Sequence, residues 1–412
     1  MTTTLALGAE IMPRIDDLAA VSESPDGLTR QYLTPEHHRA NDLVGRWMGD
    51  AGMTVRQDAV GNIVGRYEGT SQGLPAVIIG SHLDTVVMAG KFDGMLGVVT
   101  GIACVGELNR QARRLPFAVE VVGFADEEGV RFQSTYLGSR AMAGRFEPEL
   151  LARRGTDGVS LAEAMTAFGL DPARIGDAAR QAEDVLAYLE LHIEQGPVLE
   201  SQDLPVGVVT AISGATRLVV ELTGEAGHAG TVPMSLRRDA LAAAAKCVLA
   251  VERVCSETPN LVGTVGWIDA NPGATNVIPG AVCFAVDLRA TEDSRRTLAL
   301  GEIMALFESA ATRRGIAIDI DKVHEAASVP CDARLSGIIA GAIERNGWRA
   351  HRLPSGAGHD AAAMADLAPV GMIFVRCEGG VSHNPAESIT AADAEAGARV
   401  LLQVLNDFGE NS

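Results

Sequence analysis

Short apolar runs alternate with segments of helical periodicity along much of the chain. Ala76–Ile79 and Ala118–Phe124 are β-branched, mostly apolar runs of strand length, and they flank Met95–Arg114, where apolar residues predict a helix. Parallel strands need a long connection, so strand, helix and strand in this order predict a parallel α/β sheet. Ala187–Ile193 and Gly371–Arg376 are further apolar runs, and we expect them to extend the same sheet.

Other segments of the chain also have patterns of apolar and polar residues that predict helices and strands. Pro35–Ala51 and Ala391–Phe408 have the apolar spacing of amphipathic helices. Thr54–Tyr67 predicts strand with a turn at residues 61–62 (Gly-Asn), and the charged, alanine-rich segment Glu147–Asp184 is expected to be mostly helical.

A different pattern begins near residues 212–214. Its half-buried strands alternate apolar and polar residues, and the elements follow the β-α-β-β-α-β order of a ferredoxin-like motif. The expected elements are Arg217–Thr223, Asp239–Val254, Leu261–Trp267, Ala281–Arg289, Thr291–Arg314 and Ile316–Ile320. We therefore expect residues 213–327 to form a smaller domain inserted between two parts of the first, residues 1–212 and 328–412.

Composition narrows the class of protein. The chain has 412 residues, 47% of them hydrophobic, which suits a two-domain globular protein with a sizeable core. Its net charge of −19 argues against nucleic acid or an anionic membrane as a partner. A small anionic substrate remains compatible with this charge, because a local arginine or bound cations reverse the sign within a cleft.

The cysteines and the N-terminal segment indicate a reducing compartment. None of the six cysteines forms a Cys-x-x-Cys pair, and most lie in apolar context, as expected of buried free thiols. There is no basic region followed by an apolar core at the N-terminus, and no apolar run reaches the roughly 20 residues of a membrane helix. We expect a cytoplasmic protein.

Candidate metal ligands follow the apolar runs. His82 and Asp84 come just after Ala76–Ile79, and side chains two apart on an extended segment share a face. A carboxylate beside a histidine can fix the tautomer that binds a metal. Asp93 arrives soon afterwards, immediately before Gly94 and the expected helix. Taken alone, this pattern also fits a polar surface loop.

More such groups follow the other expected strands. Residues 126–128 (Asp-Glu-Glu) come after one strand, and His192 and His383 lie at or beyond the ends of two more. Sites in α/β sheets form at the carboxyl ends of strands, although an isolated Asp-Glu-Glu is more often a solvated turn. Together the groups offer nitrogen and oxygen donors suited to two zinc or manganese ions, with one carboxylate left as a general base.

Glycine-rich segments supply a second set of candidates. Residues 224–230 and 274–280 lie in the expected smaller domain, and residues 356–360 lie in the larger one. Their glycines allow the backbone to approach a ligand closely, although ordinary turns explain them equally well. Arg289 ends an alternating strand, where a single arginine would usually be a surface residue.

These segments resemble the dinuclear metal amidohydrolases of the hydantoinase/carbamoylase type. This branch of the aminoacylase and carboxypeptidase superfamily contains N-carbamoyl-L-amino-acid hydrolases, allantoate amidohydrolases and β-ureidopropionases. The match runs from about Leu28 to the C-terminus. Its motifs, in the family's order, are Gly80–Asp84, Lys91–Gly94, Asp126–Gly129, Glu190–Gly196, Gly227–Met234, Thr275–Gly280, Gly356–Asp360 and Ser382–Glu387.

The resemblance implies a fold and a metal centre. The fold would be a metallopeptidase-like α/β domain with a mixed, mainly parallel sheet, carrying an inserted ferredoxin-like lid and dimerisation domain. Each subunit would hold two divalent ions, zinc or manganese, with cobalt or nickel as alternatives. The implied ligands are His82 and His192 for one ion, Glu128 and His383 for the other, and Asp93 as the bridge.

The resemblance also implies roles around the metals. Glu127 would be the general base, and Asp84 would orient His82. The residues implied to hold a small ureido acid substrate are Gln195, His228, Asn276, Arg289 and, through its backbone, Gly358. His228 would also help to stabilise the oxyanion, from the same subunit or from the partner in a homodimer.

Two other functions remain open at this level. Peptidases and aminoacylases of the superfamily usually have a carboxylate where this chain has His192, so the histidine resembles the ureido-specific branch. An aminoacylase or dipeptidase is nevertheless the first alternative. The second is a catalytically silent binding protein, although no ligand or base is missing from the motifs. The sequence does not separate allantoate from an N-carbamoyl-amino acid, because both carry a ureido group and a carboxylate.

Overall fold

The computed structural model describes residues 6–410 and divides into two compact units. One unit consists of the chain up to Thr210 together with the chain from Cys331 onward, and the other is Ala211–Pro330. The second unit thus interrupts the first in sequence. The expected boundaries of the inserted segment were residues 213 and 327.

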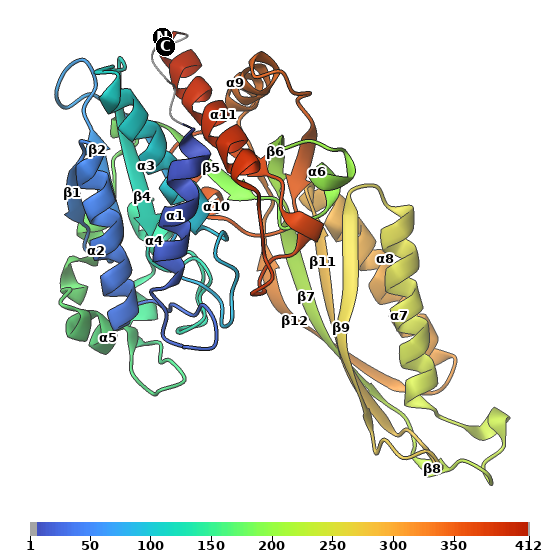
Figure 1. The fold of residues 1–412 in the computed structure, drawn as a ribbon. Helices are drawn as coiled ribbons and strands as arrows, with labels where there is room; N and C mark the ends of the chain where they lie inside the picture. Colours follow the sequence, from blue (N-terminus) through green and yellow to red (C-terminus); the bar gives the residue numbers. More distant parts are fainter. Residues whose placement is uncertain (1–5, 411–412) are drawn as a thin grey trace. The chain divides into compact units, whose positions relative to one another are not determined.

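A nine-stranded sheet organises the larger unit within residues 6–410, and its order is β1-β2-β4-β3-β5-β15-β6-β13, with β14 beside β6 (Figure 1). Its four central neighbours, β4, β3, β5 and β15, run parallel, which confirms the predicted α/β fold with a mixed, mainly parallel sheet. The strands are β1 (Thr54–Gln57), β2 (Ile63–Tyr67), β3 (Ala76–His82), β4 (Ala118–Phe124), β5 (Val185–Ile193), β6 (Val206–Ile212), β13 (Val329–Pro330), β14 (Arg352–Ser355) and β15 (Val370–Val375).

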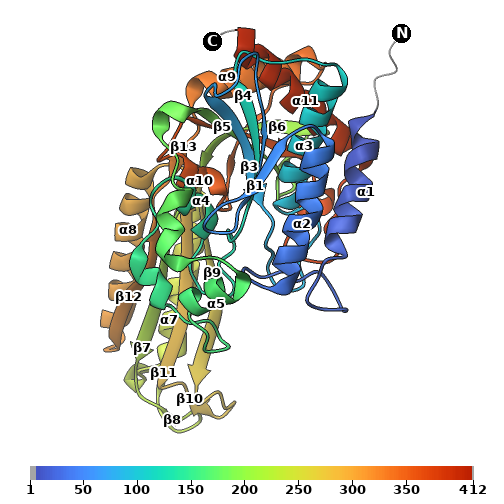
Figure 2. The same cartoon turned by 90° about the vertical axis from the view of Figure 1, so that its left-hand side faces the viewer.

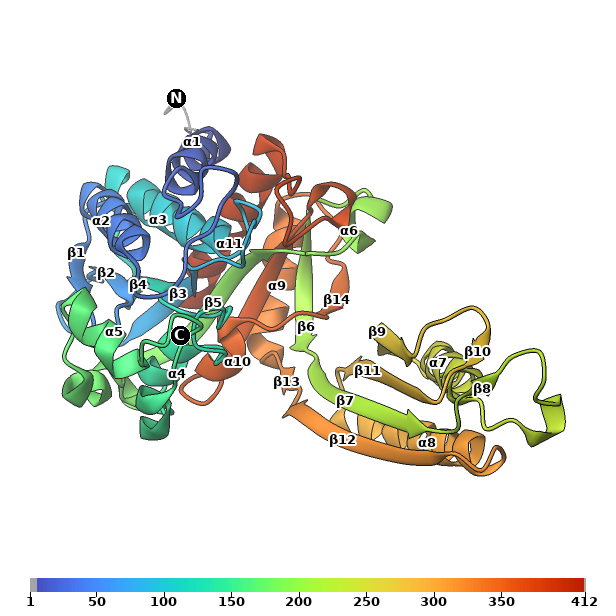
Figure 3. The same cartoon turned by 90° about the horizontal axis from the view of Figure 1, so that it is seen from below.

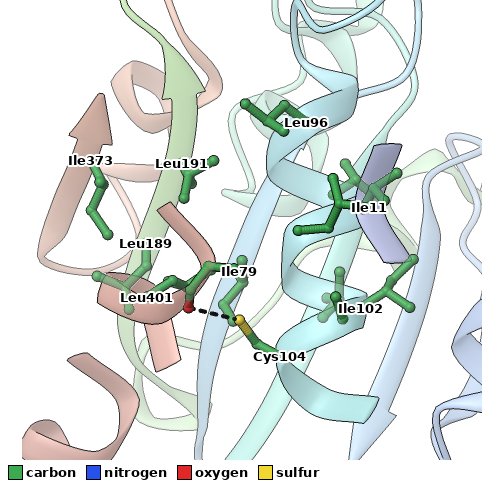
Figure 4. Close-up of a cluster of buried hydrophobic side chains, with 14 of the residues drawn as sticks. Ile11, Ile79, Leu96, Ile102, Cys104, Leu189, Leu191, Ile373 and Leu401 are labelled. Carbon is green, nitrogen blue, oxygen red and sulfur yellow. Dashed lines mark hydrogen bonds between the residues drawn. The ribbon is translucent and has the colours of Figure 1, made fainter. Parts of the chain in front are cut away.

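The main hydrophobic core lies between this sheet and the helices on one of its faces (Figures 1 and 2). These helices are α1 (Leu7–Ala19), α2 (Pro35–Asp50), α3 (Met95–Arg110), α9 (Ala333–Arg345) and α11 (Ala391–Glu410). Ile79, Leu189 and Leu191 of the central strands meet Ile11, Ile102 and Leu401 of the helices (Figure 4). The thiol of Cys104 lies in the same layer and donates to the carbonyl oxygen of Ala398, 3.4 Å away (Figure 4).

One predicted helix is shorter than expected, and the segment predicted to be mostly helical is divided into short helical pieces. The helix that begins at Met95 ends at Arg110 because Ala112 takes a left-handed conformation with φ of 49°. Residues 147–184 contain a single α-helix of eight residues, with short 3₁₀ turns around it. Gly158 and Gly169, with φ of 78° and 93°, interrupt the helical pattern there. The elements are η1 (Pro148–Ala152), α5 (Leu161–Phe168), η2 (Pro172–Ala178) and η3 (Ala182–Asp184).

The remaining short helices of the larger unit are α4 (Leu137–Met142), α6 (Val198–Ser201), α10 (Asp360–Met364) and η5 (Glu378–Gly380). Of these, α10 packs against α4 and against β3, β5 and β15. It thereby lies near the carboxyl ends of the parallel strands, where the candidate site is found.

The second unit is a four-stranded antiparallel sheet of order β12-β7-β11-β9, covered on one face by two helices (Figure 3). Its larger elements occur in the β-α-β-β-α-β order. They are β7 (Gly214–Thr223), α7 (Ala240–Glu257), β9 (Leu261–Asn271), β11 (Ala281–Ala290), α8 (Asp293–Thr312) and β12 (Ala317–Ala326), with η4 (Met234–Leu236) and the small ladder of β8 (Gly227–His228) and β10 (Val277–Ile278).

Two further observations concern the cysteines and the length of the apolar helices. All six cysteines lie within residues 6–410 and are free, four of them buried. No helix formed by residues 6–410 is long and apolar enough to cross a membrane.

Candidate metal centre

The parallel strands bring the predicted metal-binding residues to one edge of the sheet. His82 is the last residue of β3, His192 lies near the end of β5, and residues 126–128 follow β4 directly. Since these strands are parallel, their carboxyl ends meet at the same edge. His383 approaches from the segment beyond β15 with a φ of 52°, in the left-handed region.

Asp93 lies at the centre of this group. Its Oδ1 is 3.2 Å from Nε2 of His82 and 3.2 Å from Nε2 of His192. Its Oδ2 is 3.4 Å from Nε2 of His383, whose Nε2 is in turn 3.5 Å from Oε1 of Glu128. The two oxygens of one buried carboxylate thus face two different sets of ligand atoms, as a bridging ligand requires.

Gly94 permits this approach. It has a φ of 74°, and a Cβ added to it would lie 2.5 Å from Nε2 of His82. Any larger residue would displace the histidine from Asp93.

The histidine tautomers suit metal binding. Nδ1 of His82 lies 2.9 Å from the carbonyl oxygen of Asp84, and Nδ1 of His192 lies 2.9 Å from the carbonyl oxygen of Ile193. The backbone N–H of Gly94 donates to Nε2 of His192 over 3.1 Å, so this Nε2 is the acceptor nitrogen. An Nδ1 that donates to a carbonyl leaves Nε2, the nitrogen on the side of Asp93, without a proton and able to bind a metal.

Asp84 acts through contacts that its sequence position did not reveal. Its carboxylate is 3.6 Å from Nδ1 of His82, too far for a strong hydrogen bond, and it is the Asp84 carbonyl that meets this nitrogen. The carboxylate oxygens instead accept the backbone N–H groups of Glu127 and Glu128, at 2.9 and 3.1 Å. Asp84 therefore fixes the backbone that carries the other two carboxylates.

The cluster concentrates negative charge in a buried place. Burial, followed by the charges of Asp93 and Asp84, raises the pKa of Glu128 to about 7. Burial and the neighbouring carboxylates, Glu128 first, raise the pKa of Glu127 well above its ordinary range. Divalent cations would relieve this repulsion and lower both pKa values, because a bound ion is the largest charge in such a site.

Among residues 6–410, three sets of ligand atoms fit a metal ion, with all atoms of a set within 4.8 Å of one another. The sets are His82 with Asp93 and His192, His82 with Glu127 and Glu128, and Asp93 with Glu128 and His383. Imidazole and carboxylate donors without a thiolate suit zinc, manganese, cobalt or nickel. The residues present therefore fit divalent cations.

Glu387 supports the centre, a role that the sequence did not reveal. Its Oε1 accepts the backbone N–H groups of Phe92 at 2.8 Å and Asp93 at 3.1 Å, and its Oε2 accepts Oγ–H of Ser382 at 3.0 Å. It thus joins the segment that carries Asp93 to the segment that carries His383. The acidic end of the Ser-His-Asn-Pro-Ala-Glu motif was the available signal.

The predicted substrate residues fall into both units. In the larger unit, Gln195 donates from Nε2 to Oδ2 of Asp93 over 2.7 Å, and Gly358 lies just before α10. In the second unit, exposed His228 pairs with Val277, and Ala229 N–H donates to the carbonyl of Asn276 over 3.0 Å.

Arg289 lies on β11 of the second unit, where it meets Asp287. Its Nε and one Nη are 2.8 and 3.1 Å from the two carboxylate oxygens of Asp287, and Nε of Arg217 is 2.9 Å from the same carboxylate. The second unit thus has an arginine held in a fixed orientation on the face of its sheet.

The comparisons with known proteins identify the family. The model of peptidase family M20/M25/M40 matches residues 78–407. The chain belongs to this family. Its members are metal-dependent hydrolases, in keeping with the candidate metal-binding residues described above.

The chain is similar over nearly its whole length to amidohydrolases of one branch of this family. An N-carbamoyl-L-amino acid amidohydrolase from Geobacillus stearothermophilus is 44% identical over 97% of this chain and 98% of the relative. A probable allantoate deiminase from Oryza sativa subsp. japonica is 41% identical over 96% of this chain and 88% of the relative. The crystal structure of an amidase of the hydantoinase/carbamoylase family from Burkholderia multivorans has a TM-score of 0.92 and 34% identity, with 97% of each chain covered. The resemblance to hydantoinase/carbamoylase amidohydrolases is thereby confirmed.

Proposed function

We propose that this protein is a metal-dependent amidohydrolase that cleaves the ureido C–N bond of an N-carbamoyl-L-amino acid or of allantoate. The observation that carries the proposal is the group of three imidazole Nε2 atoms around Asp93, with Glu127 buried beside it. The relatives named above act on ureido compounds according to their names, and their similarity spans nearly the whole chain.

We assign two divalent ions to the centre, zinc or manganese, with cobalt or nickel as alternatives. His82 and His192 would hold one ion, and Glu128 and His383 would hold the other. Asp93 would bind both ions. This division agrees with the distances, since Oδ1 of Asp93 faces the first pair and Oδ2 faces His383.

The mechanism follows from the residues around this centre. Bound divalent cations would polarise the ureido carbonyl and lower the pKa of the attacking water. Glu127 takes one proton from this water as its oxygen adds to the carbamoyl carbon. Glu127 then returns the proton to the leaving nitrogen as the C–N bond breaks. The products are the free amine and carbamic acid, which decomposes to carbon dioxide and ammonia.

A substrate panel tests the function. The metal-reconstituted protein should release ammonia from allantoate or from N-carbamoyl-L-amino acids and should leave N-acyl amino acids and dipeptides intact. If the protein instead hydrolyses N-acyl amino acids or dipeptides and does not hydrolyse ureides, it is an aminoacylase or dipeptidase. Ligand binding that is unchanged after metal removal, without turnover, would identify a silent binding protein.

We also propose that the protein acts in the cytoplasm. Six free cysteines within residues 6–410, four of them buried, suit a reducing compartment.

Arg289 is proposed to bind the substrate carboxylate, because a guanidinium presents a planar fork that lysine lacks. Arg289→Lys is expected to raise KM for ureides that bear a carboxylate and barely change it for a matched ureide without one. Steady-state kinetics on the substrate pair make the measurement. Arg217→Lys is the matched control, since Arg217 contacts the same Asp287. Equal losses on both substrates would refute this role.

The second unit is proposed to be a lid and dimerisation domain of a homodimer. The outer face of α7 presents Leu241 and Leu249, which are 39% and 57% exposed, beside small alanines. The edge strand β9 presents Val262, Trp267 and Ile268, which are 60%, 48% and 47% exposed. Apolar side chains on a helix and on an open sheet edge favour a two-fold contact.

In such a dimer we propose that His228 completes the partner's site. Mixing two inactive variants, His228→Ala and Glu127→Gln, under conditions that exchange subunits should restore activity. A mixed dimer then has one intact site and one site that lacks both groups. If His228 acts within its own subunit, every site lacks one group and activity stays lost. Absence of recovery despite demonstrated subunit exchange would overturn the shared site.

A further inference from the structure

Tyr136 is held on the backbone of the carboxylate segment. Its N–H donates to the carbonyl of Glu127 over 3.1 Å, and the next N–H, of Leu137, donates to the carbonyl of Asp126 over 2.8 Å. Tyr136 has φ of 63° and ψ of 28°, a left-handed conformation that is unfavourable for an aromatic residue. Strain of this kind is maintained by the surrounding structure and concentrates at functional sites.

The phenol of Tyr136 lies against Gly358. A Cβ added to Gly358 would be 1.9 Å from the phenol oxygen and 3.1 Å from Cζ. Only a glycine allows the hydroxyl to take this position. Gly358 is the residue expected to contact substrate through its backbone, and with that role the neighbouring hydroxyl would also face the substrate.

The hydroxyl is available as a donor. The other three tyrosines each donate within the protein: Tyr32 to the carbonyl of Val60, Tyr67 to that of Arg113 and Tyr188 to Oε2 of Glu190, at 2.6, 3.0 and 3.1 Å. Among residues 6–410 the Tyr136 hydroxyl has no such hydrogen-bond partner. Burial and then the charge of Glu127 raise the pKa of Tyr136, so the hydroxyl keeps its proton at neutral pH.

We propose that Tyr136 is a further catalytic residue, whose hydroxyl donates a hydrogen bond to the ureido oxygen as negative charge develops on it. The proposal rests on the proposed function. A fixed donor stabilises the transition state more than the ground state, because the ureido oxygen becomes more negative as the water oxygen adds to the carbamoyl carbon. The proton stays on the tyrosine throughout, so Glu127 remains the only residue that transfers one.

Tyr136→Phe tests this role, because it removes one oxygen and keeps the ring. Turnover should fall roughly 10²-fold, with KM changed by less than about threefold, as for loss of one oxyanion donor. Metal content and Tm should stay at wild-type values. Tyr67→Phe is the matched control: it removes a phenol that donates to the backbone of Arg113, and it should leave kcat unchanged.

Several results would overturn the proposal. If the Tyr136→Phe variant keeps the wild-type kcat, the hydroxyl is not a donor in the transition state. If only KM rises, the hydroxyl contacts the substrate in the ground state. A fall in metal content or in Tm would make it a structural residue. If the wild-type protein releases no ammonia from any ureide, the proposed function fails first, independently of Tyr136.

Discussion

Replacement of Glu127 by glutamine should abolish nearly all turnover while both metal ions stay bound. Glutamine has almost the same shape, but it cannot accept the proton of the attacking water. Loss of a general base lowers rate by roughly 10²–10⁴-fold. The backbone at this position should not move, since Asp84 holds the N–H of residue 127 at 2.9 Å whatever the side chain.

The measurement combines kcat with elemental analysis of dialysed protein. Glu128→Gln is the matched control, because the neighbouring carboxylate is assigned as a ligand and lies 3.5 Å from Nε2 of His383. That variant should lose part of its metal. If the Glu127→Gln variant has near-normal turnover, Glu127 is not the general base. If this variant loses metal, Glu127 is a metal ligand.

The Asp93→Asn variant should bind neither metal ion and should therefore have no measurable activity. The two oxygens of Asp93 face three imidazole nitrogens at 3.2, 3.2 and 3.4 Å. Asparagine offers one neutral oxygen and an NH₂ group that cannot bind a cation. The backbone N–H of residue 93 still donates to Glu387 in this variant, so the backbone around residue 93 should keep its conformation.

Elemental analysis and thermal unfolding measure this loss. Added metal should raise the Tm of the wild-type protein and leave that of Asp93→Asn unchanged, since a ligand at 100 times its Kd stabilises by about 2.7 kcal/mol. Asp42→Asn, an exposed carboxylate on α2, should behave as wild type. Retention of both ions in Asp93→Asn would refute the bridging role.

The sequence predicted the strands of the centre and the polar residues at their ends, because both are local properties. Apolar runs of strand length mark β3, β4 and β5, and a parallel arrangement necessarily brings their carboxyl ends together. His82 and His192 were therefore placed correctly at one edge of the sheet.

Other features depend on contacts between distant segments, which one sequence does not reveal. The carboxylate of Asp84 binds backbone groups 43 and 44 residues away, whereas the i, i+2 spacing suggested His82. The approach of the Tyr136 hydroxyl to Gly358 likewise joins two segments far apart in the chain. The helical segment expected over residues 147–184 is divided into short pieces for a local reason, because Gly158 and Gly169 take left-handed conformations that interrupt an α-helix.

The contact between Glu387 and Asp93 also fixes when the protein can become active during its synthesis. The two residues are 294 positions apart, so at 5–20 residues per second about 15–60 s separate their emergence from the ribosome. His82, Asp93 and His192 are made first and can form a half-site on the nascent chain. The set that contains His383 can form only after residue 383 has emerged from the ribosome. In the proposed two-ion centre, the ion held by Glu128 and His383 would therefore be loaded after the other, and a chain truncated before residue 383 would lack one of its ligands.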